Sequence, residues 1–342
     1  MIDLGPWLGG VPDAVVARIA SARRVLAVGH ENPDADTLGA TLAVCRFVEH
    51  AGGAATAVFS DPVPPIYDYL PAAVRARTDP DPSTDYDLLV VSDCGTLDRI
   101  GAVVGRHPEL FERLPRVVID HHASNAAVGG LDWIEPGSAA TCEMTTLLAV
   151  RLGVPLDLDE GALAAELMSG IVMDTATFAH PNATPRTLAV SAALVEAGAP
   201  LSDISRRLYR SKPDEQLRLF GRVLDRIETA AEGRIIHSSL FDADLAAVGA
   251  IPPHSEGIID LLAQSESAEV AILFKEAGEG TRLSVRTKPA GVDATVLTGI
   301  FGGGGHARAS GATLPEPVAS ARPRVLAEAE RLVAAVRRPQ PA

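Results

Sequence analysis

Four short apolar runs of this 342-residue sequence are each followed by acidic or histidine side chains. The runs cover residues 24–29, 86–92, 116–119 and 167–173. The side chains that follow them are His30, Asp34, Asp36, Asp93, Asp120, His121, His122 and Asp174. Carboxylate and imidazole groups bind divalent cations, and they also act as general acids and bases. We therefore expect metal-ion or proton-transfer chemistry wherever these segments meet.

These side chains can act together only if the fold brings them to one place. The segments 85–93 and 115–122 contain continuous apolar runs of strand length, which is typical of strands buried on both faces of a parallel sheet. The carboxyl ends of parallel strands lie at one edge of the sheet, and open α/β folds bind ligands there. The sequence therefore predicts that the five aspartates and three histidines converge at this edge.

Such a cluster is electrostatically unfavourable without cations, because carboxylates at contact distance repel and some would have to bind protons. The predicted donor set has no thiolate, which favours Mn²⁺ or Mg²⁺, with Fe²⁺ or Co²⁺ as alternatives, over structural Zn²⁺. The number of candidate ligands suits two cations about 3.5–4 Å apart, an arrangement that cleaves phosphate esters. We expect two divalent cations, most of all Mn²⁺.

Each motif also has an ordinary structural explanation. An Asp-x-Asp after a proline is often a turn or a helix N-cap, and an aspartate after a strand can cap the following turn. A histidine pair at a strand end can be a packed or a surface feature. Four such features, each at the end of an apolar run, favour one shared site over separate structural roles.

A second group of candidates surrounds four consecutive glycines, residues 302–305, which are followed by His306 and Arg308. Arg286 lies upstream in an expected strand. Glycines let backbone N–H groups approach an anion, a helix starting there would add its positive end, and guanidinium groups match phosphate oxygens. Flexibility of the glycines and an ion pair of Arg286 are the alternatives. We expect phosphate recognition here.

Alternating strand and helix patterns over the first half predict an α/β domain with a doubly wound, mainly parallel sheet. The pattern changes after the turn cluster HPNATP at 180–185, and a second, smaller α+β domain follows. We place the first domain at 1–190, a helical linker at 191–215 and the second domain at 216–342.

Composition restricts the partners. The net charge of −14 argues against a long duplex nucleic acid, and an aromatic content of 4% argues against an extended single-strand groove. Three cysteines are too few for a disulfide framework. The first residues lack the pattern of a signal peptide, and no apolar run approaches the roughly 18–20 residues that span a bilayer. We expect a cytoplasmic protein without a membrane partner.

Together these motifs resemble the DHH phosphoesterase superfamily. The resemblance is carried by HENPDAD at 30–36, Asp93, the Asp-His-His triplet at 120–122, Asp174 and GGGGH at 302–306. It extends from about residue 11 to residue 330, and the second domain resembles the DHH-associated domain. The length and domain pairing are most similar to the nanoRNase/pAp-phosphatase subfamily, which includes cyclic-di-AMP phosphodiesterases.

The resemblance implies roles for individual residues. One cation would be held by His30, Asp34, Asp93 and Asp174, and the other by Asp36, Asp93, His121 and Asp174. His122 would face the substrate phosphate, Asp120 would support the histidines, and Asn125 would contact the substrate. The second domain would bind the far phosphate or nucleotide through Arg286, Gly303, Gly304, Gly305, His306 and Arg308.

The resemblance also implies an activity, namely metal-dependent hydrolysis of short oligoribonucleotides and of cyclic or linear dinucleotides to nucleoside monophosphates. A 3′-phosphatase activity on pAp and a homodimer are further expectations from the resemblance. Two alternatives stay open. One is a pyrophosphatase or exopolyphosphatase of the same superfamily, and the other is a nucleotide-binding sensor without catalysis.

Overall fold

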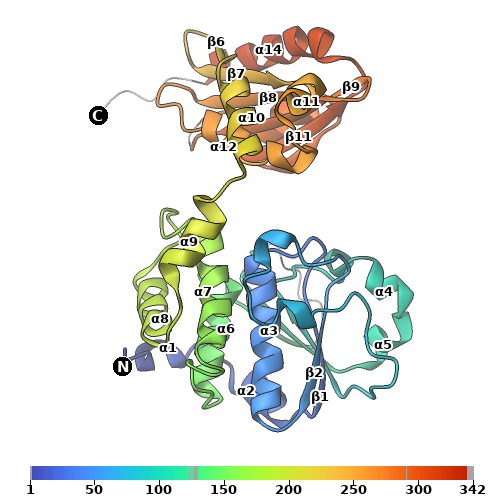
Figure 1. Ribbon diagram of the computed structural model, residues 1–342, viewed down its shortest axis with the longest axis vertical. Helices are drawn as coiled ribbons and strands as arrows, with labels where there is room; N and C mark the ends of the chain where they lie inside the picture. Colours follow the sequence, from blue (N-terminus) through green and yellow to red (C-terminus); the bar gives the residue numbers. More distant parts are fainter. Residues whose placement is uncertain (1, 124, 126–129, 290, 337–342) are drawn as a thin grey trace. The chain divides into compact units, whose positions relative to one another are not determined.

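The computed structural model describes residues 2–123, 125, 130–289 and 291–336, and the chain divides into two units, Met1–Ser211 and Lys212–Ala342 (Figure 1). Helix α9, Leu201–Tyr209, lies in the segment that we expected to be a linker. It packs against α7, Ala162–Asp174, within the first unit, and buries Ile204 and Leu208 there. The second unit therefore begins directly after this helix.

Five parallel strands form the sheet of the first unit in the order β2-β1-β3-β4-β5. The strands are β1 Arg24–Val28, β2 Ala54–Val58, β3 Leu88–Ser92, β4 Arg116–Asp120 and β5 Leu131–Ile134. Alternate residues face opposite sides. Leu88 and Val90 join one hydrophobic cluster, and Leu89 and Val91 join another. This confirms the predicted parallel sheet, because strands buried on both faces read as continuous apolar runs.

Helices cover both faces of this sheet (Figure 1). On one side lie α3, α6 and α7, and on the other lie α4 and α5. The remaining bounds in this unit are α1 Gly5–Leu8, α2 Asp13–Ser21, α3 Ala35–His50, α4 Ala102–Arg106, α5 Pro108–Arg113, α6 Thr141–Arg151 and α8 Pro185–Glu196. The strand order reverses between β1 and β3, and such a reversal is where doubly wound sheets open a crevice at their carboxyl edge.

Two glycines let α3 and α7 approach closely next to this edge. A Cβ atom on Gly39 would lie 2.4 Å from the Glu166 carbonyl oxygen, and one on Gly170 would lie 2.4 Å from Asp36 Oδ1. Cβ atoms do not occur at such distances, so larger residues at either position would push the helices apart. The contact matters for function because Asp36 lies at the start of α3.

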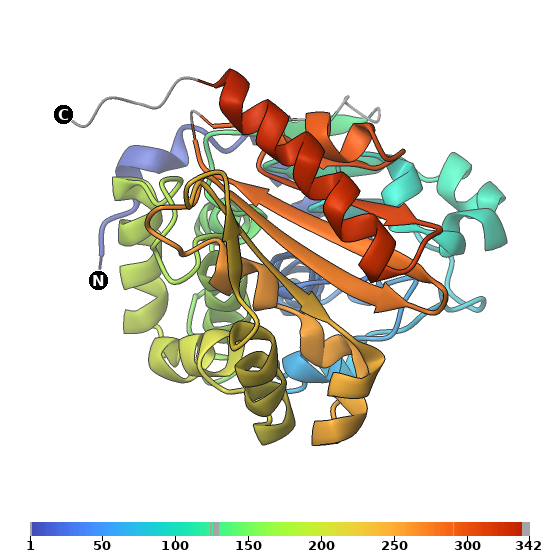
Figure 2. The same cartoon turned by 90° about the horizontal axis from the view of Figure 1, so that it is seen from above.

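The second unit contains a six-stranded mixed sheet in the order β10-β11-β9-β8-β7-β6, in which only β7 and β8 are parallel neighbours. Its strands are β6 Glu228–Ala230, β7 Ile235–Leu240, β8 Val270–Ala277, β9 Gly280–Thr287, β10 Gly304–His306 and β11 Ala309–Leu314. Its helices are α10 Asp214–Leu224, α11 Asp242–Val248, α12 Ile258–Leu262, α13 Ala294–Gly299 and α14 Val318–Ala335. Helix α14 crosses one face of the sheet (Figure 2), and α10 and α12 pack on the other. The predicted α+β unit is confirmed.

The helix that could have started at the glycine run is absent there, which corrects our expectation. Residues 304–306 form β10, and α13 ends before the glycines begin. The reason is steric. A Cβ atom on Gly303 would lie 2.1 Å from the carbonyl oxygen of Gly311, and Gly305 has a φ of +141°. These glycines let the β10–β11 hairpin close.

Within the described residues, no single helix is long and apolar enough to cross a membrane. Helices α8 and α9 reach that length only as a pair, and they are bent by 114° at their junction.

Candidate metal centre

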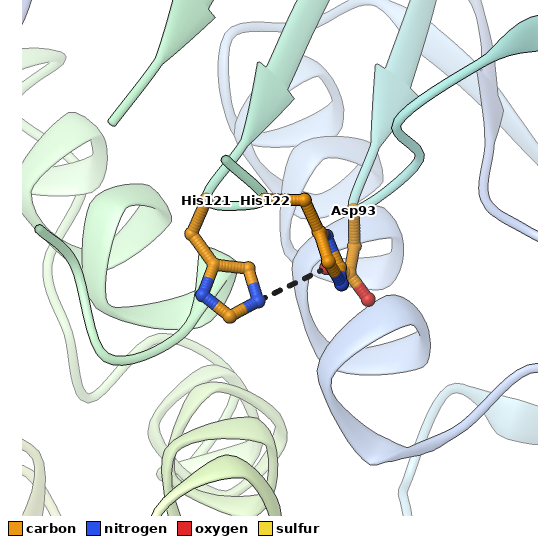
Figure 3. Close-up of side chains that lie close together, drawn as sticks. All are labelled: Asp93, His121 and His122. Atoms are coloured by element: carbon orange, nitrogen blue, oxygen red, sulfur yellow. Dashed lines mark ion pairs between the residues drawn. The ribbon is translucent and has the colours of Figure 1, made fainter. Parts of the chain in front are cut away.

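The six predicted metal ligands and His122 lie at the carboxyl edge of the first sheet. They form three groups, and within each group the ligand atoms are all within 4.8 Å of one another. The groups are His30, Asp34 and Asp93; Asp36, His121 and Asp174; and Asp93, His121 and His122. Asp93 belongs to two groups, and so does His121. Figure 3 shows His121 and His122 following β4, with the His121 ring turned toward Asp93 at the end of β3.

The turn before α3 positions two of the aspartates. Asp34 is the N-cap of α3, and its Oδ1 accepts hydrogen bonds from the backbone N–H groups of Asp36 and Thr37, both 3.0 Å long. The N-cap explanation is therefore correct for Asp34, yet its Oδ2 lies 3.8 Å from His30 Nε2. The carboxylate can serve both roles because its two oxygens point to different partners.

Asp36 is fully buried and is held from a distant part of the sequence. Its two carboxylate oxygens accept hydrogen bonds from the backbone N–H groups of Thr141 and Cys142, at 2.7 and 2.8 Å. These N–H groups open helix α6, so the positive end of that helix stabilises the carboxylate. The first turn of α6 therefore fixes the position of Asp36.

Two threonine hydroxyls, which the sequence reasoning missed, hold Asp93. Thr37 Oγ1 donates to Asp93 Oδ2 at 2.6 Å, and Thr141 Oγ1 donates to Asp93 Oδ1 at 3.0 Å. Asp93 has a φ of +55°, a left-handed conformation that non-glycine residues rarely adopt and that concentrates at functional sites. Thr37 could have been predicted as a site residue because it directly follows Asp36. No sequence pattern marked Thr141 as a site residue.

Backbone carbonyl acceptors fix the tautomers of two histidines. His30 Nδ1 lies 2.7 Å from the Glu31 carbonyl oxygen, and His121 Nδ1 lies 3.3 Å from the Ser138 carbonyl oxygen. A carbonyl oxygen only accepts, so Nδ1 carries the proton in both rings and the neutral ring keeps its Nε2 lone pair. His121 Nε2 lies 3.2 Å from Asp174 Oδ2, and His30 Nε2 lies 3.6 Å from Asp93 Oδ2. Metal-binding histidines are commonly oriented in this way.

Charge crowding shifts the acid–base properties of the group. Burial, with Asp174 and Asp93 nearby, raises the pKa of Asp36 well above its usual range. Burial also opposes ionisation of Asp93, but hydrogen bonds from His30 and Thr37 and the charge on His121 outweigh it and lower the pKa of Asp93. Burial lowers the pKa of His121, yet the adjacent Asp174 and Asp36 outweigh it and raise that pKa to about 10. The crowded carboxylates therefore favour the binding of positive charge among these side chains.

Asp174 comes from the C-terminal residue of helix α7 and not from a strand end. A carboxylate is unfavourable at this end of a helix because it meets the negative end of the helix dipole. The segment that follows is unusual too, since Ala176, Thr177 and Phe178 all have left-handed φ values, between 47° and 64°. Such strain costs free energy and is typical of functional segments.

His122, Asp120 and Asn125 form a short chain beside these groups. His122 Nδ1 lies 2.8 Å from Asp120 Oδ1, and the Asn125 amide donates to Asp120 Oδ2 at 2.7 Å. Asp120 is fully buried, so it orients two side chains that are less buried than itself. The hydrogen bond to Asp120 raises the pKa of His122.

The remaining predicted residues belong to the second unit. Arg286 on β9 and His306 on β10 do not pair directly. Both lie opposite Ala309 of β11, the strand between them. They share one face of the sheet. The Arg286 guanidinium donates from Nε to Asp260 Oδ1 at 2.9 Å, so the expected alternative, an ion pair, is present. Arg308 donates to the Lys288 carbonyl oxygen at 2.7 Å.

The donor set fits divalent cations. Two imidazole Nε2 atoms and carboxylates of four aspartates lie around the same space, and their mutual repulsion is relieved by positive charge. These oxygen and nitrogen donors match Mn²⁺ and Mg²⁺ chemistry.

The sequence and the structure can now be compared with known proteins. Residues 24–171 match the DHH family, N-terminal domain, and residues 237–335 match the DHHA1 domain. The bifunctional oligoribonuclease and PAP phosphatase NrnA of Thermus thermophilus is 30% identical over 285 residues, which cover 83% of this chain and 82% of that protein. The chain belongs to the DHH family. These matches also confirm the expected nanoRNase/pAp-phosphatase subfamily.

Two further proteins extend the comparison. A probable manganese-dependent inorganic pyrophosphatase of Streptococcus agalactiae is 23% identical over 274 residues, covering 75% of this chain and 79% of that protein. An exopolyphosphatase-related protein from Bacteroides fragilis has a similar solved structure, with a TM-score of 0.83, 20% identity and coverage of 95% of this chain and 98% of that chain. The latter likeness shows that this DHH chain has the same fold.

Proposed function

We propose that this DHH protein is a divalent-metal-dependent phosphodiesterase that hydrolyses very short oligoribonucleotides and dinucleotides to nucleoside monophosphates. The proposal extends to the 3′-phosphate of pAp. The observation that carries it is the group of aspartates and histidines around Asp93, together with a relative named as an oligoribonuclease and PAP phosphatase.

In this proposal, one cation would be held by the group of His30, Asp34 and Asp93 and the other by the group of Asp36, His121 and Asp174. Asp93 and Asp174 would each contribute to both cations. Such cations polarise the phosphoryl group and make water nucleophilic near neutral pH. We propose Mn²⁺ as the preferred ion.

The chain's own residues supply binding and orientation. The hydrogen bond to Asp120 favours the protonated ring of His122, which donates from Nδ1 to Asp120 and can donate from Nε2 to a phosphoryl oxygen, and Asn125 holds Asp120 in place. Donors aimed at developing negative charge are a major source of catalysis. In the second unit, Arg286 and His306 share a sheet face and would offer cationic and donor groups to a phosphate or nucleotide.

A second candidate function is hydrolysis of pyrophosphate or polyphosphate, which the names of two similar proteins suggest. It needs the same cations but no nucleotide contacts. The two candidates therefore differ in the role of the second unit and not in the proposed metal ligands.

A product assay separates these functions. The protein, supplied with Mn²⁺, is incubated with pApA, a short oligoribonucleotide, cyclic di-AMP, pAp and pyrophosphate, and the products are separated by chromatography. We expect AMP from pApA, and loss of that product in Asp93→Asn. The exposed Asp98→Asn, five residues along the chain, is the matched control and should keep full turnover. Rapid release of phosphate from pyrophosphate alone would favour the second candidate, and full turnover by Asp93→Asn would reject the site.

A further inference from the structure

The turn between β5 and α6, residues 135–140, holds candidate ligands in place, although no sequence motif marks it. It provides the Ser138 carbonyl oxygen that fixes the His121 tautomer, at 3.3 Å. The residue directly after it, Thr141, donates its N–H to Asp36 and its hydroxyl to Asp93, at 2.7 and 3.0 Å. Any movement of this turn would therefore displace three candidate ligands at once.

The turn does not hold itself in place by helix capping. Its last residue, Ala140, is the N-cap of α6 and has no side-chain oxygen with which to cap a helix. The turn instead depends on a side chain from another element that is only 16% exposed, Arg186 in the first turn of α8.

Arg186 binds the turn at two points and the following helix at a third. Its Nη2 donates to Ser138 Oγ at 2.7 Å, its Nη1 pairs with Glu135, and its Nε pairs with Glu143. Glu143 is fully buried on α6, and its second oxygen accepts the N–H of Ala139 at 3.2 Å. One guanidinium thus ties together both ends of the turn and the helix that follows it.

Burying such a group is weak evidence for a role in stability. Moving an arginine and two carboxylates out of water costs several kcal/mol, and well-packed apolar residues often replace buried ion pairs without loss. Its planar fork does, however, fix the direction of its partners better than an apolar contact could. The geometry is therefore better suited to holding the turn in one position.

We propose that Arg186 is a positioning residue of the metal centre, acting through the 135–140 turn on His121, Asp36 and Asp93 without touching a cation. This inference rests on the proposed metal-dependent function. Partners one step removed from the ligands typically change metal affinity by about 10–100-fold when they are removed.

The chain offers a matched control in Arg46. This arginine of α3 is also buried between two carboxylates of the first unit, those of Glu166 and Asp159. Its partner Glu166 accepts the N–H of Ala72 at 3.0 Å, so this second network joins α3, α7 and the 3₁₀ turn Ala73–Arg75. Within the described part of the chain, Arg46 makes no hydrogen bond or ion pair with the 135–140 turn. Arg46 lies about 15 Å along α3 from Asp36 by helix rise, and its partner Glu166 is near the end of α7 opposite to Asp174. Unlike a clash at Gly170, Arg46→Gln should therefore cost stability without moving the candidate ligands.

The experiment measures Mn²⁺ affinity by calorimetry on the metal-free full-length protein, alongside thermal unfolding of the same samples. We expect Arg186→Gln to weaken Mn²⁺ binding by about 10–100-fold. Arg46→Gln should stay within about twofold of the wild type at a comparable loss of thermal stability. Arg186→Lys, which keeps the charge but not the fork, should give an intermediate affinity. For pApA, kcat should fall with affinity in Arg186→Gln when Mn²⁺ is limiting.

The outcomes separate the inference from the function on which it rests. Wild-type affinity in Arg186→Gln, or equal losses in Arg186→Gln and Arg46→Gln, would overturn the positioning role while leaving the proposed function intact. If wild-type protein bound no Mn²⁺, both would fail. If Arg186→Gln does not fold, Ser138→Ala is tested in its place. Ser138→Ala removes only the hydroxyl that accepts the hydrogen bond from Arg186. Ser138→Ala should then weaken Mn²⁺ binding several-fold, and unchanged affinity would overturn the inference.

Discussion

Replacing Gly170 by alanine tests whether the close approach of α3 and α7 sets the position of the candidate metal ligands. A Cβ atom at residue 170 would lie 2.4 Å from Asp36 Oδ1, 2.4 Å from Cys142 Sγ and 2.8 Å from Asp36 Cα. One of these atoms belongs to the backbone, so rotation of a side chain cannot relieve the clash. The two helices must separate, or Asp36 must move.

The expected magnitude follows from two opposing effects. Alanine favours a helix over glycine by about 1 kcal/mol, whereas overpacking a tight core costs about 1–3 kcal/mol and sometimes more. Because the clash includes a backbone atom, we place its cost at about 2–3 kcal/mol and expect the free energy of unfolding of the first unit to fall by about 1–2 kcal/mol. For a unit of this size, that corresponds to a decrease in Tm of about 2–8 °C. Mn²⁺ affinity should fall about tenfold or more, because sites tolerate ligand displacements of only about 0.5 Å.

Gly105 provides the control. It is an exposed glycine of α4 in the same unit, and an added Cβ would meet nothing within 4 Å among the described residues. Gly105→Ala should therefore keep or raise Tm, by up to about 1 kcal/mol of helix propensity, and leave Mn²⁺ affinity unchanged. Thermal unfolding followed by circular dichroism, with calorimetric titration of Mn²⁺, measures both quantities. If Gly170→Ala behaved like Gly105→Ala, the reasoning about this helix contact would be wrong.

Three further predictions concern the second unit. Burial lowers the pKa of His237, so the unfolded state binds a proton before the folded state does as the pH falls below about 6.5. The free energy of unfolding measured in urea should therefore decrease below this pH in the wild type but not in His237→Leu. Gly303→Ala should destabilise this unit by about 1–3 kcal/mol, because its Cβ would meet the opposing strand. Gly304→Ala should not destabilise it, because an added Cβ there has open space around it among the described residues. Equal unfolding midpoints of the two variants would contradict this prediction. Two arginines hold the pKa of buried Asp244 well below its usual range, so its contribution is present above about pH 4 and is lost as the pH falls further. Asp244→Asn should cost about 1–3 kcal/mol at pH 7, whereas the exposed Asp225→Asn should cost nothing measurable in the same urea titration.

The ends of the parallel strands could be predicted from the sequence because two physical rules coincide. Strands buried on both faces are continuous apolar runs, and their carboxyl ends share one edge of the sheet. His30, Asp93 and His121 follow such runs directly, so their convergence could be expected without knowing the strand order.

Other parts of the site depend on tertiary contacts that no local pattern encodes. Asp174 was expected in the cluster because it ends an apolar run, but it comes from a helix end, where the helix dipole disfavours a carboxylate. Thr141 and Ser138 act through a turn whose sequence gives no signal, and Arg186 resembles any surface arginine until α8 is placed beside it. The strand that the glycine run of the second unit forms was missed for a related reason. Glycines that favour anion contact also permit a tight strand pair, and only the opposing strand shows that this pair forms.

Crystals of the protein grown with Mn²⁺ test the central claim most directly, through anomalous scattering at the manganese absorption edge. We expect two anomalous peaks at the carboxyl edge of the first sheet, both contacted by Asp93 and Asp174, with His30 at one and His121 at the other. Crystals without anomalous density among these four side chains, at Mn²⁺ concentrations that support turnover, would contradict the account.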